Sequence, residues 1–186
     1  MKRSALLIVD MINAFEFDGG RQLLVHARKA SRNVLLLRDG FAARRWPVIY
    51  CNDNFGQWRS DFRSVIQCCS QADAAGAGIA MMLRPRPDDY FILKPKHSAF
   101  FSTPLELLLR SLRLKRILIC GIAGDGCVLA TATDAHIREY EVVVATDATA
   151  SESAARNRRA LEHLAITGTA ELRATKTILS SRRASA

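Results

Sequence analysis

Short apolar runs alternate with stretches in which apolar residues recur at helical spacing along most of the chain. Most of the runs carry four or more apolar residues together, as strands do when both of their faces are buried. We expect strands over residues 5–9, 48–52, 90–93, 116–120 and 141–145, and a short sixth strand over 170–174. Strands that alternate with helices predict a parallel sheet covered on both faces, which is a three-layer α/β/α fold with about six strands.

The stretches between the strands predict the helices. The spacing predicts a long helix over residues 21–45, with Gly40 as a point where it could break, and two short helices within 62–83. Thr103 is placed as an N-cap, followed by Pro104 at the first helical position and Glu106 at the third. Further helices are expected after Cys127 and over residues 152–164, with a final turn over 175–179.

Composition limits the class of protein. The 186 residues, 49% of them apolar, fit one domain spanning residues 1–186. No apolar run approaches the roughly 20 residues of a membrane span, so we expect no membrane partner. Met1 and the apolar run after it imitate a leader peptide, but Asp10 and Asn13 interrupt the run. The segment is therefore interpreted as the first strand.

Cysteine count and charge bear on location and partners. Five cysteines without a C-x-x-C pair argue against a disulfide framework and a zinc site, and favour a reducing, cytoplasmic location. The net charge of +9 is dispersed over separate segments without interleaved aromatic residues, which is typical of solvated helix faces. We therefore expect a small-molecule substrate and no nucleic acid, and a disordered basic tail from about residue 180. A nucleotide- or nucleic-acid-binding module is the alternative from another class.

The segment over residues 121–128 carries the strongest chemical signal. Cys127 follows a buried strand and precedes an alanine-rich helix, so it sits on a strand-to-helix turn that contains three glycines. The first N–H groups of a helix lack partners within it, and the helix dipole favours a thiolate or a developing oxyanion there. A buried packing role is the alternative interpretation of this cysteine.

Two further residues lie at the predicted carboxyl ends of strands. Asp10 ends the first apolar run, and Lys94 ends the third. Ligands of parallel sheets bind at this edge, so both residues are candidates for a site with Cys127. A carboxylate can take the proton of a thiol, and an ammonium nearby favours both anions and helps to polarise a carbonyl. The three residues together would suffice for acyl transfer.

Four segments in order resemble the isochorismatase-like cysteine hydrolases: residues 6–15, 94–106, 121–135 and 142–148. The resemblance spans residues 5 to about 164. It implies a Rossmann-like fold in which Cys127 is the nucleophile, Asp10 the general base and Lys94 the third catalytic residue. It also implies an oxyanion hole from the backbone N–H groups of Ala123 and Cys127, a cis peptide between Ile122 and Ala123, and homo-oligomerisation.

Departures from the family narrow the expectation. Nicotinamidases of this superfamily carry metal-binding histidines after the second strand, whereas residues 53–58 contain none, so we expect no metal and no cofactor. Gly124 stands where a threonine is frequent. Cys127 favours attack on a carbonyl and hence C–N hydrolysis of a small amide, carbamoyl or lactam substrate. The alternative is an isochorismatase-type vinyl-ether hydrolase, which needs no thioester.

The substrate pocket is predicted from aromatic and amide side chains beside these strand ends. We expect the pocket to be lined by Phe15, Asn54, Trp58 and Phe100. Packing in the core is the alternative for each of them. The family resemblance names the reaction class only, because the loops that shape a pocket vary on one fold.

Overall fold

Six parallel strands form one sheet in the order β3-β2-β1-β4-β5-β6. The computed structural model describes residues 3–55 and 61–180 of the chain. The strands of this sheet are β1 (Ala5–Val9), β2 (Val48–Asp53), β3 (Tyr90–Lys94), β4 (Arg116–Ile122), β5 (Glu141–Ala150) and β6 (Glu171–Arg173). All five strand pairs are parallel, which confirms the predicted α/β class.

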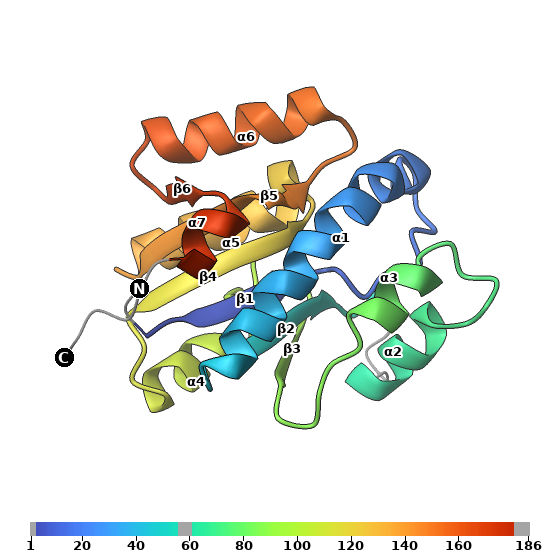
Figure 1. The fold of residues 1–186 in the computed structure, drawn as a ribbon, viewed down its shortest axis with the longest axis horizontal. Coiled ribbons are helices and arrows are strands. Elements are labelled where there is room, and N and C mark those ends of the chain that lie inside the picture. The colour runs from blue at the N-terminus through green and yellow to red at the C-terminus, as the bar shows by residue number, and fades with distance from the viewer. Residues whose placement is uncertain (1–2, 56–60, 181–186) are drawn as a thin grey trace.

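Helices connect the strands and cover the sheet (Figure 1). They are α1 (Gly20–Ala43), α2 (Phe62–Cys69), α3 (Ala77–Met82), α4 (Leu105–Ser111), α5 (Leu129–Ile137), α6 (Ala154–Ile166) and α7 (Thr175–Ser180). One turn of π-helix, η1 (Gly124–Val128), leads directly into α5. In Figure 1, α1 crosses the near face of the sheet with α7 beside it, while α4 and α5 lie behind.

Side chains of the central strand alternate between two cores. Leu6 and Ile8 of β1 pack with α1, whereas Leu7 and Val9 pack with α4 and α5 on the opposite face. All five residues of β1 are buried. This is why the strand appears in the sequence as an unbroken apolar run rather than an alternating pattern. The two cores establish the predicted three layers.

Several predicted boundaries shift. Helix α1 continues through Gly40 without a break, and Arg44 at its end donates a hydrogen bond to the carbonyl of Leu179, which ties α1 to α7. Strand β5 extends to Ala150 because Thr149 and Ala150 pair with Gly121 and Ile122 of β4. The sequence predicted that this strand ends at residue 145, where the apolar run stops.

The predicted cap of α4 is wrong in detail. The helix begins at Leu105, one residue later than expected, and Thr103 Oγ1 accepts a hydrogen bond from the Leu105 N–H at 3.2 Å. Glu106 does not close a capping box, because its carboxylate pairs with Arg138 and Arg110 instead. In the described part of the chain, no helix is long and apolar enough to cross a membrane. The predicted basic tail, residues 181–186, lies outside the described residues.

Candidate active site

The carboxyl ends of β1, β3 and β4 bring the three predicted catalytic residues together. Val9 pairs with Gly121 of β4, and Lys94 pairs with Asp53 of β2, so the residues just beyond these positions share one edge of the sheet. Asp10 follows β1, Lys94 is the last residue of β3, and Cys127 lies in η1, five residues beyond β4. The parallel topology therefore assembles residues that are far apart in the sequence.

Asp10 is fixed by hydrogen bonds at its backbone and at both carboxylate oxygens. Its backbone takes a left-handed conformation with φ of 52°, which aspartate tolerates better than most residues. Its N–H donates to the Cys51 carbonyl at 2.9 Å. Oδ1 accepts from the Asp53 N–H at 2.7 Å, and Oδ2 lies 2.9 Å from Lys94 Nζ. The carboxylate is thus held in one orientation.

Lys94 has a fully buried side chain. Its ammonium lies 3.4 Å from Cys127 Sγ and donates to the Lys96 carbonyl at 3.2 Å. The carboxylate of Asp53 stands 3.7 Å away. A buried ammonium must be paired and hydrogen-bonded, and these partners meet that need. Lys94 therefore bridges the general-base candidate and the nucleophile candidate.

The backbone of the Cys127 turn has two unusual features. The peptide between Ile122 and Ala123 is cis, as the resemblance implied. Gly121 has φ of 115°, and a Cβ there would stand 2.1 Å from the Val9 carbonyl oxygen, so only glycine fits between β1 and β4. After the cis peptide, η1 begins, and the Val128 N–H donates to the Ala123 carbonyl at 3.1 Å. Cys127 thus lies in the first helical turn, as predicted.

Burial and neighbouring charges shift the pKa values of Cys127 and Asp10. Burial and the nearby Asp10 carboxylate raise the pKa of Cys127 to about 12, although Lys94 opposes them. Burial and Asp10 thus oppose the thiolate that the helix dipole is expected to favour. Burial also raises the pKa of Asp10, against the opposing charge of Lys94. A thiol that is hydrogen-bonded to a carboxylate of raised pKa is set up to transfer its proton when it attacks.

The pKa of Lys94 is raised above its usual value. Burial alone would lower it, but the charges of Asp10 and Cys127 and the hydrogen bond with Asp10 outweigh this effect. The side chain is therefore a cation at neutral pH. A fixed positive charge beside the sulfur stabilises negative charge that develops there during attack. The site holds a base, a thiol and a permanent cation in contact.

A pocket of about 440 Å³ opens onto Cys127. Besides Asp10 and Ala123, the pocket is lined by side chains from five segments, among them Asn13, Phe17, Phe55, His97, Asp125, Glu152 and Arg156. The aromatic rings of Phe17 and Phe55 are 48% and 43% exposed. They offer apolar surface near the mouth to the part of a ligand that is remote from the sulfur.

The predicted lining residues are mostly misplaced. Phe15 is 2% exposed and belongs to the core beneath α1, so its neighbour Phe17 lines the pocket instead. Phe100 is buried on the opposite face of the sheet against Tyr140. Asn54 is buried between two residues that do line the pocket, Asp53 and Phe55. Trp58 lies outside the described residues.

Sequence reasoning missed several residues of the pocket. Asp53 ends β2 and could have been found by the strand-end rule that selected Asp10 and Lys94. Asp125 and Arg156 are joined by a 2.5 Å contact, and Arg156 also binds Glu152. No local signal places Arg156 at the pocket, because it reaches the pocket only through the packing of α6 against η1.

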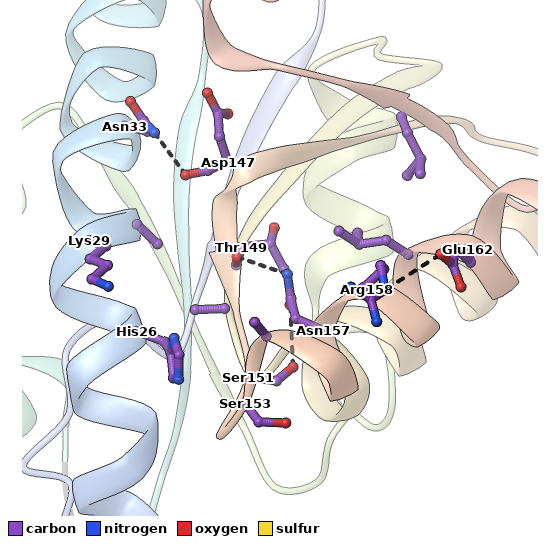
Figure 2. Close-up of a pocket in the computed structure, with 15 residues that line it drawn as sticks. His26, Lys29, Asn33, Asp147, Thr149, Ser151, Ser153, Asn157, Arg158 and Glu162 are labelled. Carbon is purple, nitrogen blue, oxygen red and sulfur yellow. Dashed lines mark hydrogen bonds and ion pairs between the residues drawn. The ribbon is translucent and has the colours of Figure 1, made fainter.

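A polar network behind η1 holds the turn against β5 and α6. The Asp125 N–H donates to Ser151 Oγ at 3.1 Å, and Ser151 Oγ donates to Asn157 Oδ1 at 3.3 Å. Figure 2 shows Asn157 bonded to Ser151 and Thr149 in a neighbouring pocket of about 500 Å³, between α1, β5 and α6. A Cβ at Gly124 would stand 2.1 Å from Asn157 Oδ1. Asn157 therefore takes the space that a side chain at position 124 would need.

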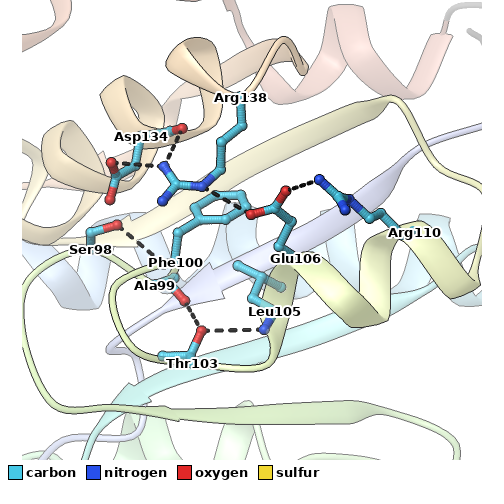
Figure 3. Close-up of polar contacts among 9 residues, drawn as sticks. All are labelled: Ser98, Ala99, Phe100, Thr103, Leu105, Glu106, Arg110, Asp134 and Arg138. Atoms are coloured by element: carbon cyan, nitrogen blue, oxygen red, sulfur yellow. Dashed lines mark hydrogen bonds and ion pairs between the residues drawn. The ribbon is translucent and has the colours of Figure 1, made fainter.

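A second network fixes the loop between Lys94 and α4. Arg138, which directly follows α5, stacks over the Phe100 ring at 5.2 Å and binds Glu106 and Asp134 (Figure 3). The Ala99 N–H donates to Thr131 Oγ1 at 3.0 Å, which joins the same loop to α5. Because η1 leads directly into α5, these contacts tie the segment after Lys94 to the segment that carries Cys127.

Metal ions in proteins are held by clusters of histidine, cysteine and carboxylate side chains. Within residues 3–55 and 61–180, no group of three or more histidine, cysteine, aspartate or glutamate side chains is arranged to hold one. His97 lines the pocket, while His26 lies in the neighbouring pocket. The absence of a metal and of a cofactor remains a prediction from the sequence.

The amino-acid sequence matches one family of known proteins. The model of the isochorismatase domain matches residues 4–177. The isochorismatase family protein YaaI of Bacillus subtilis (strain 168) is 44% identical over 157 residues, which cover 84% of this chain and 86% of the relative. The ureidoacrylate amidohydrolase RutB of Cronobacter sakazakii is 28% identical over 180 residues, covering 80% and 75% of the two chains.

A solved structure extends the likeness to the fold. The N-carbamoylsarcosine amidase of Thermoplasma acidophilum superposes with a TM-score of 0.74 at 25% identity, covering 97% of this chain and 99% of that one. The isochorismatase-like fold predicted from the sequence is therefore confirmed.

Proposed function

This chain belongs to the isochorismatase family of hydrolases, and we propose that it cleaves a C–N bond of a small amide, carbamoyl or lactam substrate through a thioester on Cys127. Two of its relatives are named for amide hydrolysis, one acting on ureidoacrylate and one on N-carbamoylsarcosine. Their names support the reaction class and leave the substrate to be identified.

One observation carries the proposal. Lys94 Nζ lies 2.9 Å from Asp10 Oδ2 and 3.4 Å from Cys127 Sγ, and Asp10 and Cys127 line a pocket that can admit a small molecule, with Lys94 buried behind them. A base, a thiol and a cation in contact are what nucleophilic attack on a carbonyl requires. Vinyl-ether hydrolysis has no use for the thiol, so the arrangement favours the amide reaction.

In the first half-reaction, Asp10 takes the proton of the Cys127 thiol as the sulfur attacks the carbonyl carbon. The oxyanion that develops would accept hydrogen bonds from the N–H of Ala123, which belongs to the cis peptide, and from the N–H of Cys127, which lies in η1. The C–N bond then breaks, and the amine leaves with the proton that Asp10 carries. A thioester remains on Cys127.

In the second half-reaction, water attacks the thioester carbonyl and gives a proton to Asp10. The C–S bond breaks, the acid is released, and the proton returns to the sulfur of Cys127. Lys94 keeps its charge throughout, because its pKa is raised, and it stabilises the sulfur whenever that atom is negative. No step needs a metal or a cofactor.

The remaining expectations from the sequence belong to the same proposal. The enzyme would act in the cytoplasm on a small molecule, as a single domain that forms a homo-oligomer, without nucleic acid or a membrane as its partner. Analytical ultracentrifugation of the full chain measures the oligomeric state directly.

The first experiment is intact-protein mass spectrometry after mixing with a panel of amides, ureido acids and nicotinamide, together with an assay for released product. Wild type should gain the mass of an acyl group or release the acid. Cys127→Ala should do neither, because the nucleophile is gone. Cys68→Ala is the matched control, since Cys68 is exposed and lies outside the pocket that contains Cys127.

The result separates the proposal from its alternative. If Cys127→Ala releases product from an amide at the wild-type rate, Cys127 is not the nucleophile. If wild type and Cys127→Ala turn over isochorismate alone, and at the same rate, vinyl-ether hydrolysis replaces amide hydrolysis as the function. Isochorismate included in the panel tests that reaction in the same assay.

A further inference from the structure

Four carboxylates surround the pocket above Cys127. Asp10 and Asp53 come from the ends of β1 and β2, Asp125 comes from η1, and Glu152 comes from the segment before α6. All four residues line the same pocket of about 440 Å³. The cluster is unexpected in a chain whose net charge is +9.

Each cation at the pocket is shared by two of these carboxylates. Lys94 Nζ lies 2.9 Å from Asp10 and 3.7 Å from Asp53. Arg156 contacts Asp125 through Nε and Glu152 through Nη1. Among the described residues that line the pocket or contact its carboxylates, two cations are thus matched by four carboxylates. The pocket carries an excess of negative charge.

Hydrogen bonds hold two of these carboxylates in place. The Phe55 N–H donates to Asp53 Oδ1 at 2.7 Å. Burial acts to raise the pKa of Asp125, but hydrogen bonds with Ser151 and Arg156 outweigh it and lower the pKa. Asp53 and Asp125 are thus fixed at the pocket, where the four carboxylates outnumber the two cations.

Arg156 could instead be interpreted as a clamp for a substrate carboxylate. Its guanidinium, however, is already held on two sides, by Asp125 and by Glu152. A substrate carboxylate that reached the remaining N–H groups of Arg156 would stand close to both of these carboxylates and would be repelled by them. Arg156 is better explained as the residue that joins η1 to the start of α6.

From this charge arrangement we propose that the substrate bears no negative charge: the pocket takes an amide whose part beyond the carbonyl is uncharged or cationic, and Glu152 selects against carboxylate-bearing amides. The inference narrows the amide, carbamoyl or lactam class and rests on the proposed function. The site and its charges are nonetheless properties of the free protein, so they can be measured without knowing the substrate.

The test uses methanethiosulfonate reagents of three charges, an ethyltrimethylammonium, a methyl and an ethylsulfonate form. The Cys127 thiolate attacks the sulfenyl sulfur, a disulfide forms and methanesulfinate leaves, so the added mass reports the rate. The protein carries Cys68→Ser to remove the exposed cysteine. Rates at Cys127 are divided by those of 2-mercaptoethanol, which cancels the intrinsic reactivity of each reagent.

We expect the cationic reagent to react with Cys127 at least about tenfold faster than the anionic one at low ionic strength, with the ratio falling as salt is added. Glu152→Gln should lower this ratio by about threefold. Glu162→Gln is the matched control: it makes the same charge change on an exposed position of α6 outside this pocket and should leave the ratio unchanged. Equal rates, or faster reaction of the anionic reagent, would overturn the proposal.

Turnover then distinguishes this inference from the proposed function. Three benzamides are compared: one with a 3-aminomethyl group, one without a substituent and one with a 3-carboxylate. They share the same amide and are cationic, neutral and anionic. Turnover of the carboxylate alone contradicts the charge inference and supports amide hydrolysis. In another outcome, Cys127 reacts faster with the cationic reagent but the protein hydrolyses no amide in either panel. That outcome supports the charge selectivity of the pocket and rejects the amidase proposal, and with it an amide as the ligand.

Discussion

Lys94 is a fully buried cation whose ammonium lies 2.9 Å from the carboxylate of Asp10. Removing a charge from water costs several kcal/mol, and a close partner of opposite charge only partly offsets this cost. The pair is therefore retained in this protein for a reason other than stability. In the mechanism proposed above, it supplies the base and the fixed charge beside Cys127.

Breaking the pair should destabilise the protein strongly. Lys94→Met leaves a buried carboxylate without its cation, and we expect the free energy of unfolding to fall by about 3–5 kcal/mol. The double variant Asp10→Asn/Lys94→Met should lose less than the sum of the two single variants, because neither charge is then left alone. Urea denaturation of the four proteins measures this coupling. Additive losses would show that the two residues do not depend on each other.

The strand-end rule explains why the catalytic candidates could be predicted from the sequence. Asp10, Lys94 and Cys127 each come at or after the end of an apolar run, and parallel strands place their carboxyl ends at one edge of the sheet. The rule depends on local sequence alone. Asp53 obeys it too, and was missed because the second strand was predicted one residue too short.

The pocket walls could not be predicted in the same way. Phe15 and Phe17 lie two residues apart in a loop without periodicity, and the left-handed backbone at Phe15, with φ of 61°, decides which ring points into the core. Arg156 and Asn157 come from a helix whose pattern shows only one polar face. Their contacts with Asp125 and with the space beside Gly124 arise from tertiary packing.

The pH dependence of kcat/KM should report the protonation of Asp10. Burial raises the pKa of this carboxyl, so activity should be lost on acidification at a higher pH than an ordinary aspartate would give. Burial and Asp10 raise the pKa of the Cys127 thiol to about 12, so we expect no further rise in activity between about pH 8 and 9.5, where ordinary thiols ionise. The profile is measured with an amide that the wild-type protein hydrolyses.

Asp53→Asn should move the acidic limb to lower pH. The Asp53 carboxylate lies 3.7 Å from Lys94 and competes for its charge. Removing that negative charge favours ionisation of Asp10 and so lowers the pKa of Asp10. Glu162→Gln, far from the pocket, should leave the limb in place. A limb that shifts upward in Asp53→Asn would contradict the assignment of Asp10 as the base.

Two glycines of the Cys127 turn should respond differently to alanine. In Gly124→Ala the new Cβ would meet Asn157 Oδ1 at 2.1 Å, so we expect a loss of about 1–3 kcal/mol in the free energy of unfolding. At Gly126 the nearest neighbour of a Cβ is Ala123 at 3.7 Å, an ordinary contact. Gly126→Ala should be neutral or slightly stabilising, because alanine is the better helix former. Thermal unfolding compares the two.

Asn157→Ala provides the complementary test of that explanation. It removes the atom that occupies the space beside Gly124, so Gly124→Ala should cost less in an Asn157→Ala background than in the wild-type protein. An equal cost in both backgrounds would mean that Asn157 is not what requires glycine at position 124.

Arg138 should contribute more to stability than Arg110, although both bind Glu106. Arg138 stacks on Phe100 and binds Asp134, so it joins the loop after Lys94 to α4 and α5. Arg110 is 71% exposed and makes one ion pair within its own helix. We expect Arg138→Ala to cost about 1–2 kcal/mol and Arg110→Ala no more than about 0.5 kcal/mol.

Arg138→Lys separates charge from geometry at the same position. Lysine keeps the positive charge but lacks the planar fork that stacks on the ring and binds two carboxylates together, so it should recover less than half of the lost stability. Because the Phe100 loop begins near Lys96, whose carbonyl accepts a hydrogen bond from Lys94, loosening it should also lower kcat for any amide that is hydrolysed. Full recovery by lysine would show that charge alone holds the loop.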